Sequence, residues 1–320
     1  MSKATKVWFA IATALILIGL ILFGGIMGSN KWDFTKLSTV EYETNQHEIT
    51  KEFKAISVNT DTADITFVPS ESKSCLVVCY EQASVKHSVE VKDGTLSIKA
   101  VDTRKWYEHI GINFDTPAIT VYVPRGEYGA ISIQSSTGDV EIPKELQFES
   151  IEITESTGDI TNYASASDFI KLTTTTGDIR VENISAASLS LSVSTGRITA
   201  SGISCEGDVT VNVSTGKSVL TDVTCKSLIS NGSTGDITLT SVIATERFSI
   251  KRSTGDVKLE GCDAGELSIT TDTGDVEGSL LSEKVFIANT DTGDKAVPDT
   301  ISGGKCEVTT DTGDIRLTIK

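Results

Sequence analysis

Basic residues are scarce in this chain of 320 residues. It carries 28 Lys and Arg against 44 Asp and Glu, which gives a formal net charge of −16. Residues 131–320 hold 15 basic and 29 acidic side chains, so the acidity belongs to the C-terminal part. This charge excludes nucleic acid as a partner, because a nucleic-acid site needs a concentrated positive patch.

Histidine and cysteine are also too few, and too irregularly placed, for the common kinds of catalytic site. His47, His87 and His109 are the only histidines, and no nucleophile–base motif or zinc-ligand spacing accompanies them. The six cysteines do not follow the dense pattern of a disulfide scaffold. The sequence therefore predicts no enzyme. A polysaccharide-acting β-helix enzyme is a remote alternative. The sequence predicts no cofactor other than Ca²⁺.

One long apolar run lies near the N-terminus. Residues 7–27 carry no charge and are long enough to cross the hydrocarbon core of a bilayer. Trp8 and Trp32 flank the run as interfacial anchors, and Lys3 and Lys6 precede it. The positive-inside rule then places the N-terminus in the cytoplasm and the C-terminal domain outside a cell membrane crossed once.

A cleaved signal peptide is the alternative to this anchor. The run exceeds the usual apolar length of about 7–15 residues in signal peptides, and no A-x-A cleavage site follows it. We therefore expect residues 1–28 to form a cytoplasmic tip and a transmembrane helix. Residues 29–52, which are polar with little periodicity, are expected to form a stalk.

The dipeptide Thr-Gly recurs ten times at spacings of 19 or 20 residues, and Asp follows it in eight copies. The glycines are Gly138, Gly158, Gly177, Gly196, Gly216, Gly235, Gly255, Gly274, Gly293 and Gly313. Apolar residues occupy fixed positions seven and five residues before the glycine and two residues after it, as in Ile151, Ile153 and Ile160. Alternation on both sides of a glycine turn predicts strand, turn and strand.

A unit of this length cannot bury its apolar face alone, so neighbouring units must stack. The sequence predicts an all-β solenoid of ten to eleven coils, with ten coils in residues 131–320 and a first coil plus a strand-rich cap in residues 53–130. In the first coil Ala63 takes the place of the glycine. Tandem hairpins in a sandwich are the alternative, disfavoured because identical residue types recur in register.

The membrane helix followed by S-T-G-D-[IV] repeats resembles the bacterial "putative adhesin" family of β-strand-repeat envelope proteins, which is catalogued as a domain of unknown function. The resemblance covers roughly residues 53–320. It implies a surface-exposed β-solenoid associated with the bacterial envelope and brings no catalytic residues with it. The expected function is adhesion or binding, with a cell-wall or host glycan or protein as partner.

The Thr-Gly-Asp turns have a structural and a functional interpretation. In the structural one, Gly supplies a positive φ, Thr stacks in a ladder, and Asp makes a hydrogen bond within the turn. The turns of this kind include Thr137, Gly138, Asp139, Thr157, Gly158, Asp159, Thr234, Gly235 and Asp236. In the functional one, paired carboxylates in the last three turns bind Ca²⁺. These carboxylates are Asp272, Asp275, Asp291, Asp294, Asp311 and Asp314.

Two further features each have two possible interpretations. Cys205 and Cys225 stand at equivalent positions of adjacent coils and either form a disulfide or fill a column of small buried residues. The aromatic stretch Trp106, Tyr107, His109 and Phe114 either packs against the first coils or forms a binding patch.

The chain stops on the strand-like residues 315–320, which would leave the last coil as an open edge. End-to-end self-association into an envelope scaffold is therefore the alternative function.

Overall fold

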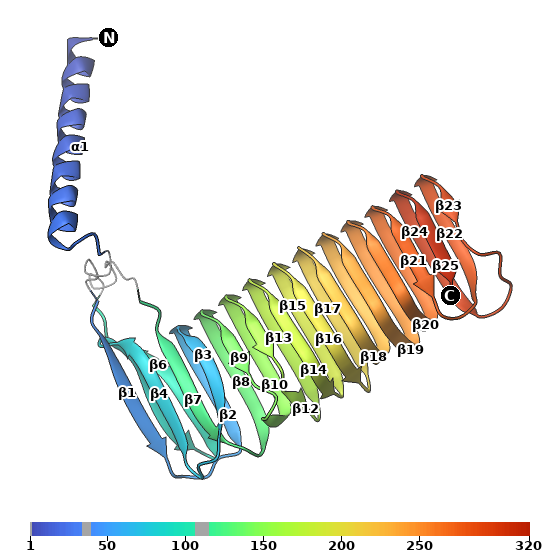
Figure 1. Ribbon diagram of the computed structural model, residues 1–320, viewed down its shortest axis with the longest axis horizontal. Coiled ribbons are helices and arrows are strands. Elements are labelled where there is room, and N and C mark those ends of the chain that lie inside the picture. The colour runs from blue at the N-terminus through green and yellow to red at the C-terminus, as the bar shows by residue number, and fades with distance from the viewer. Residues whose placement is uncertain (1, 34–39, 106–114) are drawn as a thin grey trace.

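The structure is a computed structural model that describes residues 2–33, 40–105 and 115–320. It contains one helix, α1 (Lys3–Ser29), and a continuous sheet of 25 strands wound into a rod (Figure 1). The predicted all-β solenoid of about ten turns is thereby confirmed. α1 lies at the end of the rod where the chain enters it, and is long and apolar enough to span a membrane. A signal sequence would meet the same criteria.

Each coil consists of a leading strand, the Thr-Gly turn and a trailing strand. The leading strands form one face of the rod, which we call the leading face: β2 (Ala55–Thr62), β8 (Glu127–Thr137), β10 (Gln147–Thr157), β13 (Phe169–Thr176), β15 (Ser188–Thr195), β17 (Asp208–Thr215), β22 (Lys284–Thr292) and β24 (Gly304–Thr312).

The trailing strands form the opposite, trailing face. They are β3 (Asp64–Ser70), β9 (Val140–Ile142), β11 (Ile160–Asn162), β14 (Ile179–Ala186), β16 (Ile198–Cys205), β21 (Val276–Leu280), β23 (Lys295–Ala296) and β25 (Ile315–Ile319). Three long strands bend from the trailing face of one coil into the leading face of the next: β18 (Ser218–Thr234), β19 (Ile237–Thr254) and β20 (Val257–Thr273). A short strand, β12 (Ser165–Ala166), pairs with the start of β10.

Neighbouring coils pair in parallel and in register, so like residues stack on like. Ile151 lies opposite Ile131 on one side and Ile170 on the other, and the same holds for the turn threonines. The apolar columns predicted from the sequence point inward and form one continuous core. The first coil, β2 and β3, joins the stack with Ile56 opposite Ile131.

Five strands close the end of the rod nearest α1. They are β1 (Tyr42–Ile49), β4 (Cys75–Gln82), β5 (Val85–Lys92), β6 (Thr95–Asp102) and β7 (Ala118–Pro124). β6 extends the leading face beside β2, β7 extends the trailing face beside β3, and β1, β4 and β5 add antiparallel pairings. The predicted stalk over residues 29–52 is therefore wrong for residues 42–49. These residues form a strand because all eight pair with β4.

The last two coils stack in the reverse of their chain order. β24 and β25, which end the chain, lie between β20 and β21 on one side and β22 and β23 on the other (Figure 1). The predicted open edge at residues 315–320 is therefore wrong. The coil at the distal end has Ala288 and Lys295 at inward positions, whereas the inserted coil has Val308 and Ile315, both 0% exposed. The coil with the less apolar inward residues therefore lies at the distal end of the rod, where its inner face is partly exposed to solvent.

Candidate functional site

The Thr-Gly-Asp turns stack into a continuous ridge along one edge of the rod. All ten turn glycines have a φ between +126° and +152°, a conformation that L side chains rarely adopt. A Cβ on Gly158 would lie 1.8 Å from the carbonyl oxygen of Gly138 in the preceding coil. Glycine is therefore required both by the turn conformation and by the close approach of successive coils.

The aspartates of the ridge link coils to one another. The Oδ1 atom of Asp139 accepts the backbone N–H of Asp159 at 2.8 Å, and the Oδ1 atom of Asp159 accepts that of Asp178 at 2.7 Å. The sequence predicted a hydrogen bond within each turn, but these bonds run between turns because stacking places the next N–H over the carboxylate. Arg197 and Lys217 interrupt the series, and Lys217 Nζ contacts Asp236 Oδ2 at 3.0 Å.

The proposed Ca²⁺ ligands gather at the distal end of this ridge. Because the last coils are reversed, the order along the ridge is Asp275, Asp314, Asp294. The backbone N–H of Asp314 donates to Asp275 Oδ1 at 2.8 Å, and that of Asp294 donates to Asp314 Oδ1 at 2.7 Å. Asp272, Asp291 and Asp311 are exposed on the adjacent leading strands. One carboxylate oxygen in two of the turns is thus engaged by backbone, and Ca²⁺ binding stays a proposal.

The leading face carries a stretch of uncharged polar side chains that the net charge of the chain does not suggest. Six of them define what we call the hydroxyl–amide face: Thr173, Ser190, Ser192, Thr210, Asn212 and Asn231. They stand in register, with Ser192 opposite Asn212 and Asn212 opposite Asn231, whose Nδ2 donates to Asn212 Oδ1 at 3.1 Å. Lys171 and Lys251 bound this face at its two ends.

The trailing face carries ion pairs as well as uncharged side chains. Lys258 pairs with Glu277 at 2.8 Å and Arg180 with Glu182 at 2.5 Å, while the coils between them present hydroxyls such as Thr199 and Thr238. These pairs are half exposed, so each stabilises the fold by little. Both faces therefore offer hydroxyl groups between their charged ends, and the leading face adds the amides of Asn212 and Asn231.

Two charged side chains depart from the repeat and point into the core. Glu155 is 2% exposed, and neither of its carboxylate oxygens has a hydrogen-bond partner among the described residues. Burial, and then the charges of nearby aspartates, raise its pKa to about 8. Arg252 is 4% exposed and donates from Nη2 to Ser230 Oγ at 2.9 Å, and Gly232 in the preceding coil leaves room for its guanidinium. Burial lowers the pKa of Arg252 to about 10.

An aromatic stack at the cap escaped the sequence analysis. The rings of Phe53 and Tyr128 lie 5.8 Å apart, and those of Tyr128 and Phe148 5.9 Å apart. All three residues stand ten positions before the turn residue of their coil, in the first three coils only. That shared register was the signal in the sequence. Tyr128 borders open grooves on both sides, next to Lys54 and Glu127.

The remaining predicted site residues are the aromatic patch and the cysteine pair. The patch of Trp106, Tyr107, His109 and Phe114 lies outside the described residues. Cys205 and Cys225 are both buried and free, in a column that continues with Ala186 and Ala244. The structure thus gives no disulfide there, because side chains stacked in register point the same way rather than towards each other.

A family model described as Toastrack DUF4097 matches residues 53–213 and 204–320. The search of curated proteins gives no match. Among solved structures, the chain is similar to a "putative adhesin" from Bacteroides fragilis, with 17% identity over 87% of this chain and 97% of the other and a TM-score of 0.42. A "putative lipid binding protein" from Parabacteroides distasonis has 14% identity over 88% and 98%, with a TM-score of 0.42. At these values the structures carry no argument about function.

Proposed function

The chain belongs to the Toastrack DUF4097 family, and from this premise we propose that it is a membrane-anchored rod of the bacterial envelope that binds polysaccharide. The proposed ligand is an uncharged glycan chain of the cell's own wall or of a host. The rod acts by binding, without chemistry of its own. In this arrangement α1 anchors the chain in the membrane with its N-terminus in the cytoplasm, and the solenoid projects outward.

The hydroxyl–amide face carries this proposal. Its residues repeat at the coil spacing of about 4.8 Å on a flat parallel sheet. Hydroxyl and amide groups both donate and accept hydrogen bonds, as the hydroxyls of a sugar require. The six side chains are uncharged in a strongly acidic protein, and the nearest charges on the same strands are those of Lys171 and Asp208. An extended chain of sugars could therefore contact several coils at once.

Co-sedimentation tests the proposal. The full chain in detergent would be mixed with isolated cell-wall sacculi and, separately, with mucin-type glycans coupled to beads. We expect saturable binding to one of them, reduced at least tenfold in the variant Ser192→Glu/Asn212→Glu. The matched control, Thr199→Glu/Thr238→Glu, adds the same charge to the trailing face and should bind as the parent does. Equal loss in both variants, or no binding to either glycan, contradicts the proposal.

The distal end of the rod favours self-assembly as a second function. β22 pairs with β24 on one side only among the described strands, and it exposes Val285 and Ile287 at 38% and 41%. Ile301, in the connection that follows, is 95% exposed. An unpaired strand edge with exposed apolar side chains is suited to pairing with another copy. Light scattering of the full chain in detergent would detect a dimer, which Ile287→Lys should dissociate. A strict monomer at high concentration would exclude it.

A further inference from the structure

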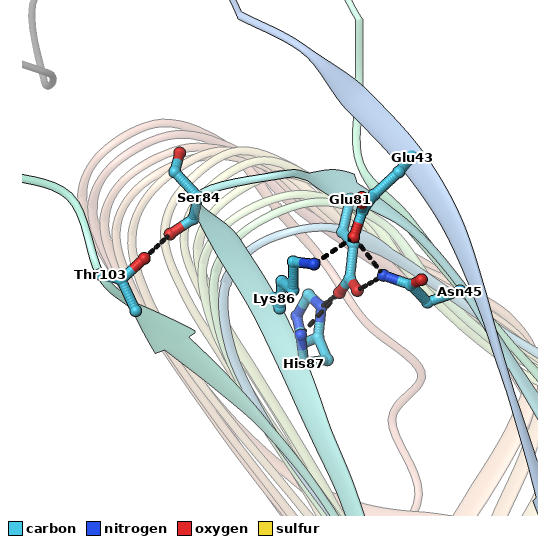
Figure 2. A network of polar contacts seen from close by, with 7 residues as sticks. All are labelled: Glu43, Asn45, Glu81, Ser84, Lys86, His87 and Thr103. Carbon is cyan, nitrogen blue, oxygen red and sulfur yellow. Dashed lines mark hydrogen bonds and ion pairs between the residues drawn. The ribbon is translucent and has the colours of Figure 1, made fainter.

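Three side chains of the cap that the sequence keeps apart meet in its interior. Cys79 and Glu81 lie on β4, two residues apart and so on the same face of the strand. The chain then turns after Gln82, which pairs with Val85, and β5 brings His87 back beside Glu81 (Figure 2). The three residues are 0%, 1% and 5% exposed. This position is unusual for a carboxylate and an imidazole, which are seldom fully buried without a specific reason.

The ligand atoms of these residues are close enough to share one ion. The sulfur of Cys79, a carboxylate oxygen of Glu81 and a ring nitrogen of His87 all lie within 4.8 Å of one another. His87 Nδ1 lies 2.6 Å from Glu81 Oε2. Bonds from Zn²⁺ of about 2.0–2.3 Å would place tetrahedral ligand atoms about 3.3–3.7 Å apart. The imidazole and carboxylate would therefore separate slightly as the thiolate draws in.

Neighbouring residues hold the ligands by their remaining atoms. Asn45 Nδ2 donates to Glu81 Oε1 at 2.7 Å, and His87 Nε2 lies 2.9 Å from Thr60 Oγ1 (Figure 2 shows the Asn45 contact). Outer partners of this kind fix the orientation and tautomer of metal ligands in proteins. Asn45 comes from β1 and Thr60 from β2, so the arrangement joins four strands.

We propose that Cys79, Glu81 and His87 form a Zn²⁺ site that clamps the cap onto the first coil of the rod. A thiolate, a carboxylate and a neutral imidazole give two negative charges, which balance the ion in this buried position. Sulfur and nitrogen ligands favour Zn²⁺ over Ca²⁺ and Mg²⁺. A water molecule as fourth ligand would complete the tetrahedral coordination.

Metal binding displaces one proton from the thiol. The ion takes the place of that proton, which leaves to solvent. Zinc affinity should therefore fall as the pH is lowered. The alternative is a hydrogen-bonded Glu81–His87 pair that needs neither the ion nor the thiol.

The role of Cys79 separates the two interpretations. The full chain in detergent, stripped of metal with a chelator, would be titrated with Co²⁺ and then with Zn²⁺. We expect one ion per chain, a thiolate-to-cobalt charge-transfer band, and its loss on addition of Zn²⁺. Cys79→Ala should abolish the band. Cys75→Ala, which removes another buried thiol from the same face of β4, should keep it. Thr60→Val should weaken Zn²⁺ binding about tenfold.

A measurement on the parent chain covers the case in which Cys79→Ala does not fold. X-ray absorption of the zinc-loaded protein should give one sulfur ligand at about 2.3 Å together with lighter ligands. No uptake of Co²⁺ or Zn²⁺, a charge-transfer band that survives in folded Cys79→Ala, or a shell of oxygen ligands only would each overturn the proposal. None of these results bears on glycan binding, which the hydroxyl–amide face carries separately.

Discussion

Glu155 makes the stability of the rod depend on pH in a way that can be measured. In the folded chain its pKa is about 8, because burial and the charges of Asp139, Asp64 and Asp159 disfavour the carboxylate. In the unfolded chain the ordinary value of 4.5 applies. Below the lower value both states carry the proton and the fold keeps its full stability. As the pH rises towards 8, the unfolded chain ionises first, and stability is lost.

The size of the loss follows from the difference between the two pKa values. Each pKa unit corresponds to about 1.4 kcal/mol. The loss is therefore about 1 kcal/mol at pH 5, about 3 kcal/mol at pH 7, and at most about 5 kcal/mol well above pH 8. Stability measured across this range also contains the mutual repulsion of the other acidic residues, so the effect must be isolated by difference.

Urea unfolding of Glu155→Gln at pH 5 and pH 8 provides that difference. We expect the variant to match the parent within about 1 kcal/mol at pH 5 and to exceed it by about 4 kcal/mol at pH 8. Glu155→Thr should show the same pH dependence as Glu155→Gln. The equivalent residue of the next coil is a threonine, Thr174, which donates to the turn carbonyl of Gly158 at 3.1 Å. Glu145→Gln, at an exposed carboxylate, controls for the change of net charge. If Glu155→Gln tracks Glu145→Gln at both pH values, the reasoning is refuted.

Three other predictions concern the turns and the coil order. Gly216→Ala would place a Cβ 1.8 Å from the carbonyl oxygen of Gly196 at a φ of +138°, so we expect a loss of about 3 kcal/mol or more by urea unfolding. Gly126→Ala, with open space around it, should cost little. Deleting residues 304–320 should expose β22 to trypsin at Lys284 and β23 at Lys295, because β24 and β25 are the only described strands that pair with them. An unchanged digest would contradict the reversed order. If the distal aspartates bind Ca²⁺, millimolar Ca²⁺ should raise the Tm above its value in EDTA, and an unchanged Tm would end that proposal.

Much of the architecture could be predicted from the repeat alone. Ten glycine turns at a nearly fixed spacing determine the number of coils, and apolar residues in register determine which side chains face inward, because stacking in register follows from identical neighbours. The aromatic register of Phe53, Tyr128 and Phe148 was present in the sequence in the same way.

The candidate sites depended on contacts that no local pattern specifies. Cys79, Glu81 and His87 have no metal-ligand spacing, and only the turn between β4 and β5 and the placement of β1 and β2 bring their partners around them. β1 itself lacks a clear apolar alternation, so its strand conformation comes from pairing with β4. The residues of the hydroxyl–amide face could be aligned from the repeat alone, but their exposure on one face of the rod required the fold.

The sequence by itself determined the conformation of each coil, because turn glycines and alternating apolar residues act within some twenty residues. The tertiary structure alone decided which coil lies on which. Every coil presents nearly the same edge to its neighbours, so backbone pairing does not distinguish one order from another. Burial of apolar side chains therefore determines the order of the last two coils. Val308 and Ile315 are shielded in the interior of the rod, and Ala288 and Lys295 lie at its open end.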